Sequence, residues 1–313
     1  MVFLVSWVPY KSTYIGVVMP ILYEFEYHKP ATVKEALRLL VKYKKPAVLA
    51  GGTDLVNELK EELAHPDAVI DIKGIRVLRS ISFKDNRLTI GAIATFTEMI
   101  ESRVVHAKFP VIAEVAKTVG SMGVRNRATM AGNVCSAVAC ADSAPLLAAY
   151  EAQVVVQGTK GKRKISAAQW FKGNRRTDLK KGELVTAIEF PLPAKQHGGC
   201  FVKLGRYSGE DLAQASVLVL ALPENQYRIA FGSVAPIPLR AGIIESLLNG
   251  KTLSNELIEQ ATGLVPEIIS PITDIRASKE YRLHMCQVML GRGVTAAVER
   301  LGGGGPAYGT SLI

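Results

Sequence analysis

Cysteine is scarce in this sequence, and its spacing excludes the common protein-held metal sites. The four cysteines are scattered and form no Cys-x-x-Cys pair (Cys135, Cys140, Cys200 and Cys286). Zinc and iron–sulfur sites need closely spaced Cys or His ligands, so we predict that this chain holds no metal of its own. The same scarcity argues against a disulfide framework and indicates a cytoplasmic protein.

The residues of an obvious catalytic centre are also lacking. The five histidines are isolated, and none is placed as a general base (His28, His65, His106, His197 and His284). Asp274, Arg276, Tyr281 and Arg282 form a polar cluster, which we interpret as an ion-pair network that docks the last helix. We therefore predict no catalytic side chain in this sequence.

No long uninterrupted hydrophobic run is present. The first 22 residues are apolar, but Lys11 and two prolines interrupt them. This segment is too broken to span a bilayer and lacks the basic start of a signal peptide. We expect residues 1–21 to be a disordered or mis-called extension, and residues 293–313, which contain Gly-Gly-Gly-Gly-Pro, to be a flexible tail.

What is present is the composition of a folded protein with excess positive charge. The 313 residues are 48% hydrophobic and 21% charged, enough for a sizeable core and two or three compact units. The net charge of +10 fits an anionic ligand, an acidic partner or a nucleic acid. The basic stretch 160–181 lacks interleaved aromatic residues, so we interpret it as a solvated hairpin, with an NAD-phosphate or partner-docking patch as the alternative and DNA binding not expected.

Helix and strand patterns are short and change in order along the chain. Thr32 with Glu35, and Thr95 with Glu98, each predict a capped helix, while the glycine-punctuated segment 120–133 predicts a loop. In the last third, strands come first and helices follow, which is typical of an α+β fold. We expect compact units over residues 22–74, 75–194 and 195–292.

Two glycine-bearing segments carry the chemistry. In Leu49-Ala50-Gly51-Gly52-Thr53-Asp54-Leu55-Val56 a strand ends, two glycines permit a sharp turn, and a helix begins. Bare backbone and the free N–H groups of a helix start suit a diphosphate, although an ordinary tight turn gives the same pattern. The second segment, 125–134, combines hydroxyl, amide and small residues that can wrap around a ligand, although a polar surface loop would have the same composition.

Taken together, the two segments resemble those of the FAD-binding subunits of the xanthine dehydrogenase and carbon monoxide dehydrogenase family. The resemblance extends over about residues 23–292. It includes Gly91-Ala92-Ile93-Ala94-Thr95 and the stretches 203–216, 232–241 and 271–282, in the family's order. It implies an α+β fold with a two-subdomain FAD-binding domain of the vanillyl-alcohol-oxidase-like type, over residues 22–74 and 75–194. A small C-terminal domain of antiparallel sheet plus helices would follow.

The resemblance also implies roles for individual residues. The first turn would hold the FAD diphosphate through backbone N–H groups (Leu49, Ala50, Gly51, Gly52, Thr53, Asp54, Leu55 and Val56). A second lip would include Thr129 and Asn133 as groups that bond the cofactor (Thr129, Met130, Ala131, Gly132 and Asn133). Asp142 would hold a polar part of FAD, and Lys203 would place a positive charge near the flavin. Val119 and Val185 would line the flavin, Val119 being smaller than the aromatic residue of some members. Ala131 departs from the glycine of many members.

The implied function is electron transfer rather than substrate chemistry. Electrons from a molybdopterin-containing large partner would pass through two [2Fe–2S] clusters of a small partner to FAD, and then to NAD⁺, oxygen or a quinone. The complex would be a dimer of heterotrimers. The alternatives are a stand-alone FAD-dependent reductase of the cell-wall precursor type and a non-enzymatic scaffold subunit. A family variant carries a [4Fe–4S] cluster on a four-cysteine insertion, and the cysteines here do not cluster in that way.

Overall fold

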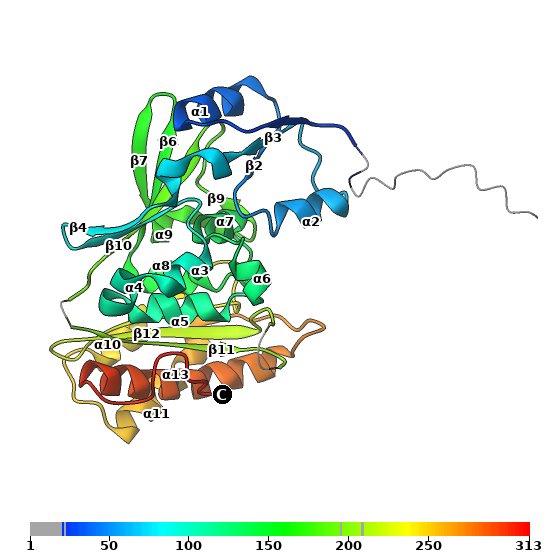
Figure 1. Ribbon diagram of the computed structural model, residues 1–313. Helices are drawn as coiled ribbons and strands as arrows, with labels where there is room; N and C mark the ends of the chain where they lie inside the picture. Colours follow the sequence, from blue (N-terminus) through cyan, green and yellow to red (C-terminus); the bar gives the residue numbers. More distant parts are fainter. Residues whose placement is uncertain (1–20, 22, 195, 208–209) are drawn as a thin grey trace, which may run out of the picture.

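A computed structural model of the chain describes residues 21, 23–194, 196–207 and 210–313. Residues 1–20, on which the expected N-terminal extension falls, lie outside the described residues. Among the described residues, three larger sheets follow one another along the chain, each with its own helices (Figure 1). The predicted α+β fold is confirmed.

The first unit is a small parallel sheet. Its strand order is β1-β3-β2, formed by β1 (Glu26–His28), β2 (Pro46–Leu49) and β3 (Ala68–Asp71). Two helices connect these strands, α1 (Val33–Lys42) and α2 (Leu55–Lys60). The parallel arrangement directs the β2–α2 turn to the carboxyl edge of the sheet, where ligands of α/β units usually bind.

Helix starts in the first two units follow the sequence signals. Thr32 accepts a hydrogen bond from the N–H of Glu35 (3.2 Å) at the start of α1. Thr95 and Glu98 form a complete capping box at the start of α3 (Phe96–Glu101). Both caps satisfy backbone donors that a helix start leaves free, and both predictions are confirmed.

The second unit is a five-stranded antiparallel sheet with helices. Its strand order is β4-β5-β10-β6-β7: β4 (Ile81–Lys84), β5 (Arg87–Gly91), β6 (Gln153–Gly158), β7 (Gly161–Ser166) and β10 (Leu184–Pro191). Two 3-10 helices, η1 (Ile72–Gly74) and η2 (Arg76–Arg79), join it to the first unit. A two-stranded ribbon of β8 (Phe171–Gly173) and β9 (Arg176–Thr177) precedes β10. The further helices are α4 (Arg103–Lys108), α5 (Pro110–Thr118), α6 (Met122–Arg125), α7 (Met130–Ser136), α8 (Ser143–Tyr150) and α9 (Ala167–Trp170).

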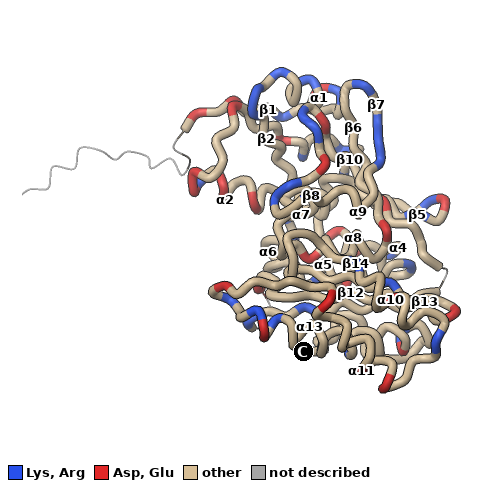
Figure 2. Tube along the Cα trace, turned by 180° about the vertical axis from the view of Figure 1, so that it is seen from behind, with Lys and Arg blue, Asp and Glu red and all other residues tan. Residues whose placement is uncertain are grey.

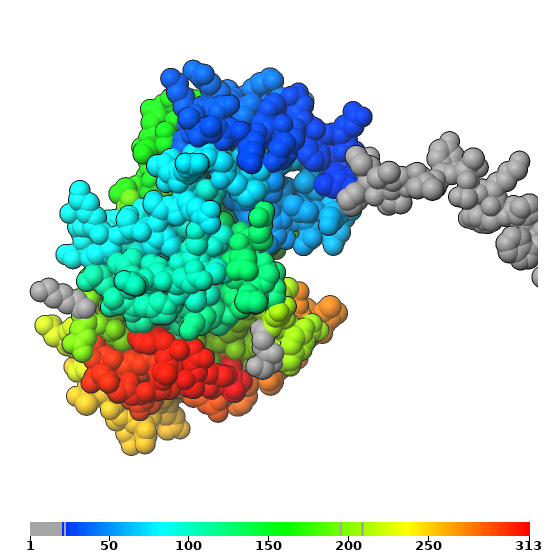
Figure 3. All heavy atoms as spheres, in the orientation of Figure 1, coloured from blue at the N-terminus to red at the C-terminus, as the bar shows by residue number. Residues whose placement is uncertain are grey.

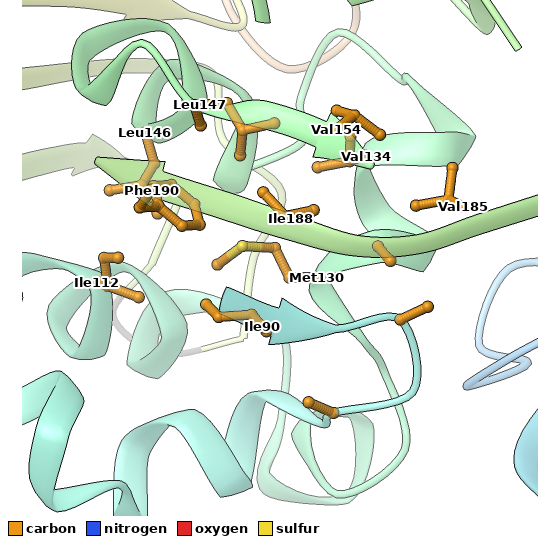
Figure 4. Packing of buried hydrophobic residues seen from close by; sticks show 14 of the residues in the cluster. Ile90, Ile112, Met130, Val134, Leu146, Leu147, Val154, Val185, Ile188 and Phe190 are labelled. Atoms are coloured by element: carbon orange, nitrogen blue, oxygen red, sulfur yellow. The ribbon is translucent and has the colours of Figure 1, made fainter. Parts of the chain in front are cut away.

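The core of this unit surrounds β10. In Figure 4, Ile188 and Phe190 lie between residues of β5, α7 and α8, and Met130 lies close to Ile188. These side chains are buried, and Met130, Ile188 and Phe190 have no exposed surface. Close packing of this kind fixes the position of β10 and of the segment that precedes it.

The prediction of a loop over residues 120–133 is wrong in part. Residues 122–125 form α6, and residues 130–133 begin α7. Ser121 and Thr129 cap these helices by accepting bonds from the N–H groups of Val124 and Gly132. Such short helices escape periodicity analysis, because one or two turns give too few apolar repeats.

The third unit is an antiparallel sheet with helices. Its order is β11-β12-β13-β14: β11 (Gly198–Leu204), β12 (Ala215–Leu222), β13 (Gln226–Gly232) and β14 (Leu239–Arg240). The helices are α10 (Gly242–Leu248), α11 (Asn255–Gly263), α12 (Val265–Ile268) and α13 (Lys279–Leu301). Figure 1 shows β11 and β12 between α5 on one side and α13 on the other. This explains why every residue of β12 is buried and why its sequence is apolar apart from Ser216.

The loop before the last helix is fixed as the sequence predicted. Arg282 is buried, pairs with Asp274 and donates to the carbonyl of Gln214 (2.9 Å). The same guanidinium donates to the carbonyl of Ser233, whose own N–H reaches Ala139 of the second unit (3.1 Å). Of the predicted cluster, Asp274 and Arg282 therefore form an ion pair that docks α13, whereas Tyr281 is exposed.

The boundary expected at residue 293 is wrong, because α13 continues to Leu301. The residues that follow fold back onto the protein. Arg300 donates to the carbonyls of Pro306 (2.9 Å) and Ala307 (3.0 Å), and Gly309 N–H donates to Glu114 (2.8 Å). Figure 3 shows the red C-terminal segment on the near face of the lower part of the molecule. The tail is thus hydrogen bonded to α5 and α13 instead of hanging free.

Candidate functional site

A cavity of about 890 Å³ lies between the first and second units and reaches the loop that follows β11. Its lining brings together the β2–α2 turn, the start of α7 and the segment that leads into β10. The loop that follows α5 and the loop between β11 and β12 also contribute lining residues. The two glycine-bearing segments therefore share one site, as the resemblance implied.

The two segments also touch each other, at Gly51. A Cβ atom on Gly51 would lie 2.3 Å from the carbonyl oxygen of Arg127 and 2.8 Å from Cα of Ala128. No side chain fits in that space, so Gly51 is required for the contact between the loops. Sequence reasoning explained this glycine by a sharp turn and by ligand approach, and missed the loop–loop contact.

Gly52 is required for a different reason. Its φ of +85° lies in the left-handed region, and a Cβ there would lie 2.9 Å from Cδ1 of Leu49. The turn therefore depends on a residue without a side chain. Asp54, two residues later, makes no cap bond at the start of α2; its carboxylate instead accepts a hydrogen bond from the hydroxyl of Ser136.

The start of α7 is organised by its own side chains. Thr129 is buried, and its Oγ1 accepts a bond from the N–H of Gly132 (3.0 Å). The side-chain oxygen of Asn133 accepts a bond from the hydroxyl of Ser143. Thr129 and Asn133 thus both line the cavity while already holding local structure.

The strongest electrostatic feature is the pair of Asp142 and Lys203. Lys203 Nζ donates to Asp142 Oδ2 (2.7 Å) and to the carbonyl of Thr118 (2.9 Å). Burial raises the pKa of Asp142 from 3.8 to about 6, although the Lys203 ammonium acts in the opposite direction. The second carboxylate oxygen, Oδ1, is buried and has no hydrogen-bond partner among the described residues. Such an atom is costly unless a ligand donates to it.

Most of the predicted site residues line the cavity. These are Ala50, Gly51, Gly52, Thr53, Asp54, Leu55, Val119, Thr129, Ala131, Gly132, Asn133, Asp142 and Val185. Leu49 and Val56 do not line it, but they flank the position that a Cβ of Gly52 would take. Met130 points into the core (Figure 4), and Lys203 lies behind Asp142.

Several lining residues were missed. They are Gly120, Ser121, Val124, Ser136, Val138 and Cys140, the segment 179–184, and residues 207 and 210–212. Gly120 and Ser121 directly follow Val119, and this adjacency was an available signal. The segment 179–184 directly precedes Val185, which gave the same signal for Leu184, whereas its more distant residues are brought to the cavity by the pairing of β10 with β5 and β6.

The described part of the chain contains neither a cluster of metal ligands nor a membrane-spanning helix. No cluster of three or more His, Cys, Asp or Glu side chains there could hold a metal ion. No helix within those residues is long and apolar enough to cross a membrane. Burial raises the pKa of Cys135, which lines the cavity, to about 12, so its thiol is not a nucleophile.

Comparison with known families agrees with this geometry. Residues 23–193 match the family described as the FAD binding domain in molybdopterin dehydrogenase. Residues 219–297 match the CO dehydrogenase flavoprotein C-terminal domain. The two matches correspond to the cavity-forming part and to the third unit.

Individual relatives extend over nearly the whole chain. The carbon monoxide dehydrogenase medium chain of Hydrogenophaga pseudoflava is 34% identical over 280 residues, which is 88% of this chain and 98% of the relative. The xanthine dehydrogenase FAD-binding subunit of Escherichia coli O157:H7 is 30% identical over 283 residues, 88% of this chain and 97% of the relative. A solved structure of carbon monoxide dehydrogenase from H. pseudoflava matches with a TM-score of 0.86 and 34% identity, covering 90% of this chain and 99% of that one. The chain therefore belongs to the family of FAD-binding medium subunits of molybdenum hydroxylases, which are oxidoreductases.

Proposed function

We propose that the cavity binds FAD between the two glycine-bearing segments. The β2–α2 turn would hold the diphosphate through backbone N–H groups, and Thr129–Asn133 would form the opposite lip. The observation that carries the proposal is Asp142, which lines the cavity of about 890 Å³ while its buried Oδ1 lacks a donor within the described structure. FAD offers N–H and O–H donors for such an oxygen, so the residues fit this group.

We further propose that the chain is the electron-transfer subunit of its complex. FAD would receive electrons from [2Fe–2S] clusters of a small partner and deliver them to NAD⁺, oxygen or a quinone, while a large molybdopterin partner oxidises the substrate. Relatives named as dehydrogenase medium chains support this reading. A dimer of heterotrimers in the cytoplasm is the assembly we expect.

Within this function, Asp142 and Lys203 would set the charge beside the cofactor. Thr118 and Asp142 fix the Lys203 ammonium, so it cannot act as an isolated positive charge. With the pKa of Asp142 at about 6, the pair is neutral well above that pH and positive below it. The pair would therefore place a net positive charge beside the cofactor only below about pH 6.

The first test identifies the nucleotide. The purified chain should be yellow, and denaturing release followed by chromatography should yield FAD rather than FMN, because the two segments suit a diphosphate. Release of FMN alone, or a well-folded chain that takes up no flavin, would contradict the FAD site and favour a scaffold role.

The second test separates electron transfer from substrate chemistry. Gly52→Asp adds a side chain at φ +85° and a negative charge where a diphosphate is expected, which should weaken FAD binding by several kcal/mol, roughly a hundredfold or more. Gly52→Asn is the matched control, since it adds the same bulk without the charge. In the assembled complex carrying Gly52→Asp, substrate should still bleach the iron–sulfur absorbance in rapid mixing, while turnover with the acceptor stops.

Two outcomes would overturn this assignment. One is turnover that persists in a complex shown to contain no flavin. The other is loss of iron–sulfur bleaching while the complex remains intact, because this chain would then act before the clusters rather than after them.

A further inference from the structure

The segment that leads into β10 has a charge pattern that the FAD site described above does not use. Lys180 and Lys181 line the cavity, and among its described lining residues they are the only Lys, Arg or His side chains. Neither lysine forms an ion pair with another described residue. In the view of Figure 2, blue Lys and Arg segments gather in the upper part of the molecule, around α1 and β7.

The acidic lining residues, in contrast, are mostly neutralised from outside the cavity. Glu58 pairs with Arg175, Asp142 with Lys203 (2.7 Å), Glu183 with Arg163 (2.8 Å) and Asp211 with Arg206 (3.7 Å). None of these four cations is a lining residue. Asp54 and Glu210, the other two acidic lining residues, form no ion pair with a described residue, so the wall carries as many unpaired acidic as basic side chains. Among the described lining residues, the two lysines are the cations available to an anionic ligand.

The backbone that carries the two lysines is held rigidly. Arg163 forms a two-bond contact with the carboxylate of Glu183 (2.8 Å for each bond) and also donates to Asp178 Oδ2 (3.0 Å). The carboxylate of Glu183 in turn accepts a bond from the N–H of Lys180 (2.8 Å). Two-bond contacts between Arg and carboxylate fix geometry as well as charge, so the turn is preorganised.

The same segment connects the two helices on either side of the Gly51–Gly52 turn. Arg175, before the lysines, pairs with Glu58 of α2. Gly182, after them, lies against α1, since a Cβ there would be 3.0 Å from Cγ2 of Val41. The lysines thus lie on a strap between α1 and α2, the helices that precede and follow the glycine turn.

We propose that Lys180 and Lys181 supply the positive charge that compensates the diphosphate of the dinucleotide cofactor. This proposal rests on the FAD site proposed above and adds two residues to it. The backbone N–H groups of the glycine turn provide hydrogen bonds but only partial charges, whereas two ammonium groups match the two negative charges of a diphosphate. The basic stretch 160–181 then contains two kinds of lysine. Lys160 and Lys162 are exposed on the β6–β7 hairpin and lie outside the cavity lining, whereas Lys180 and Lys181 belong to the site.

The experiment measures binding of FAD and of riboflavin to the flavin-free full-length chain, at low and high salt. Lys180→Gln/Lys181→Gln should weaken FAD binding on the order of tenfold at low salt, and the difference should shrink as salt screens the charges. Riboflavin has no phosphate, so its affinity should not change. Lys160→Gln/Lys162→Gln, with the same net charge, should bind FAD as the native chain does, and Lys180→Arg/Lys181→Arg should retain most of the affinity.

The proposal is overturned if the double glutamine variant binds FAD as tightly as the native chain. It is equally overturned if riboflavin binding falls by the same factor, which would mean a structural defect, or if the hairpin control loses as much. A native chain that binds no FAD at all would refute the site itself, and this outcome differs from all the others. Thermal unfolding of the flavin-free proteins, expected to be unchanged for these exposed lysines, provides a further readout.

Discussion

Two buried ion pairs in this molecule differ in whether both carboxylate oxygens accept hydrogen bonds. This difference distinguishes a pair that supports the fold from one that belongs to the binding site. Glu114 and Arg300 join α5 to α13, with side chains 3% and 2% exposed. Glu114 accepts bonds from Arg300, from the N–H of Phe201 (2.9 Å) and from the N–H of Gly309 (2.8 Å). Arg300 also donates to three backbone carbonyls. In this pair both carboxylate oxygens are used.

Asp142 and Lys203 are almost as buried, with side chains 8% and 10% exposed, but they are not complete. Lys203 uses Asp142 Oδ2 and the carbonyl of Thr118, while Asp142 Oδ1 has no donor among the described residues. A protein core tolerates a buried charge when all of its bonds are made, and an unmet bond indicates a missing partner. We infer that the Glu114–Arg300 pair holds the second and third units together. A hydrogen bond from the cofactor would complete the Asp142–Lys203 pair.

The largest effect is expected from breaking the complete pair. Arg300→Met removes the cation, leaves Glu114 buried without a countercharge, and should lower the free energy of unfolding by about 3–5 kcal/mol. Arg79→Met is the control, because Arg79 is 65% exposed in its pair with Glu98 and should cost no more than about 1 kcal/mol. Urea unfolding of the two variants checks the comparison. Equal losses would show that the α5–α13 contact is not a main support of the fold.

A smaller effect, which depends on pH, is expected from the Asp142–Lys203 pair. Because the pKa of Asp142 is raised from 3.8 to about 6, the folded chain holds this proton more tightly than the unfolded chain does. Between about pH 4 and pH 6 the ionisation of Asp142 therefore lowers stability as pH rises, by about 1–3 kcal/mol in total. Asp142→Asn should remove this contribution. Unfolding free energies of both flavin-free proteins across that range measure it as their difference.

FAD sharpens the same measurement. A ligand that donates to Asp142 Oδ1 stabilises the carboxylate and brings its pKa back toward the ordinary value. The pH-dependent difference between the native chain and Asp142→Asn should then shrink when FAD is bound. If the difference is absent in the flavin-free proteins, or if FAD leaves it unchanged, the cofactor does not donate a hydrogen bond to Asp142 Oδ1.

The sequence predicted local features well and long-range ones poorly. The capping box of Thr95 and Glu98 and the strand-to-helix turn at Gly51–Gly52 depend on neighbours within a few residues, and both are found. Lys203 was expected to place a positive charge near the flavin, and its pairing with Asp142, 61 residues away in the sequence, was not predicted. No local pattern encodes that pairing, since it depends on how β11 packs against the second unit.

The family resemblance identified the cavity but not all of its wall. Its motifs led to the two glycine-bearing segments, which lie together, while Lys180 and Lys181 were interpreted as part of a solvated hairpin. Their position depends on the register of β10 with β6, which includes an irregularity between Val185 and Ala187. Pairing of this kind is fixed by the whole sheet and is not visible in any one segment.

The smallest effect tests whether a cavity residue whose hydrogen bonds are all made supports the fold, as Glu114 does, or binds the cofactor, as we infer for Asp142. Thr129 was expected to bond the cofactor, yet its Oγ1 already caps α7 through the N–H of Gly132 (3.0 Å). Thr129→Ala should therefore lower the unfolding free energy by about 1 kcal/mol, the usual cost of losing an N-cap, while FAD affinity stays nearly unchanged. Thr129→Ser keeps the oxygen and should retain the stability. Urea unfolding and FAD titration of the flavin-free chain measure the two quantities separately.

A loss of FAD affinity of about fivefold or more in Thr129→Ala, restored in Thr129→Ser, would show that the hydroxyl also donates to the cofactor. Thr129 would then be a ligand as well as a cap, and complete local bonding would no longer be enough to distinguish supporting residues from binding ones.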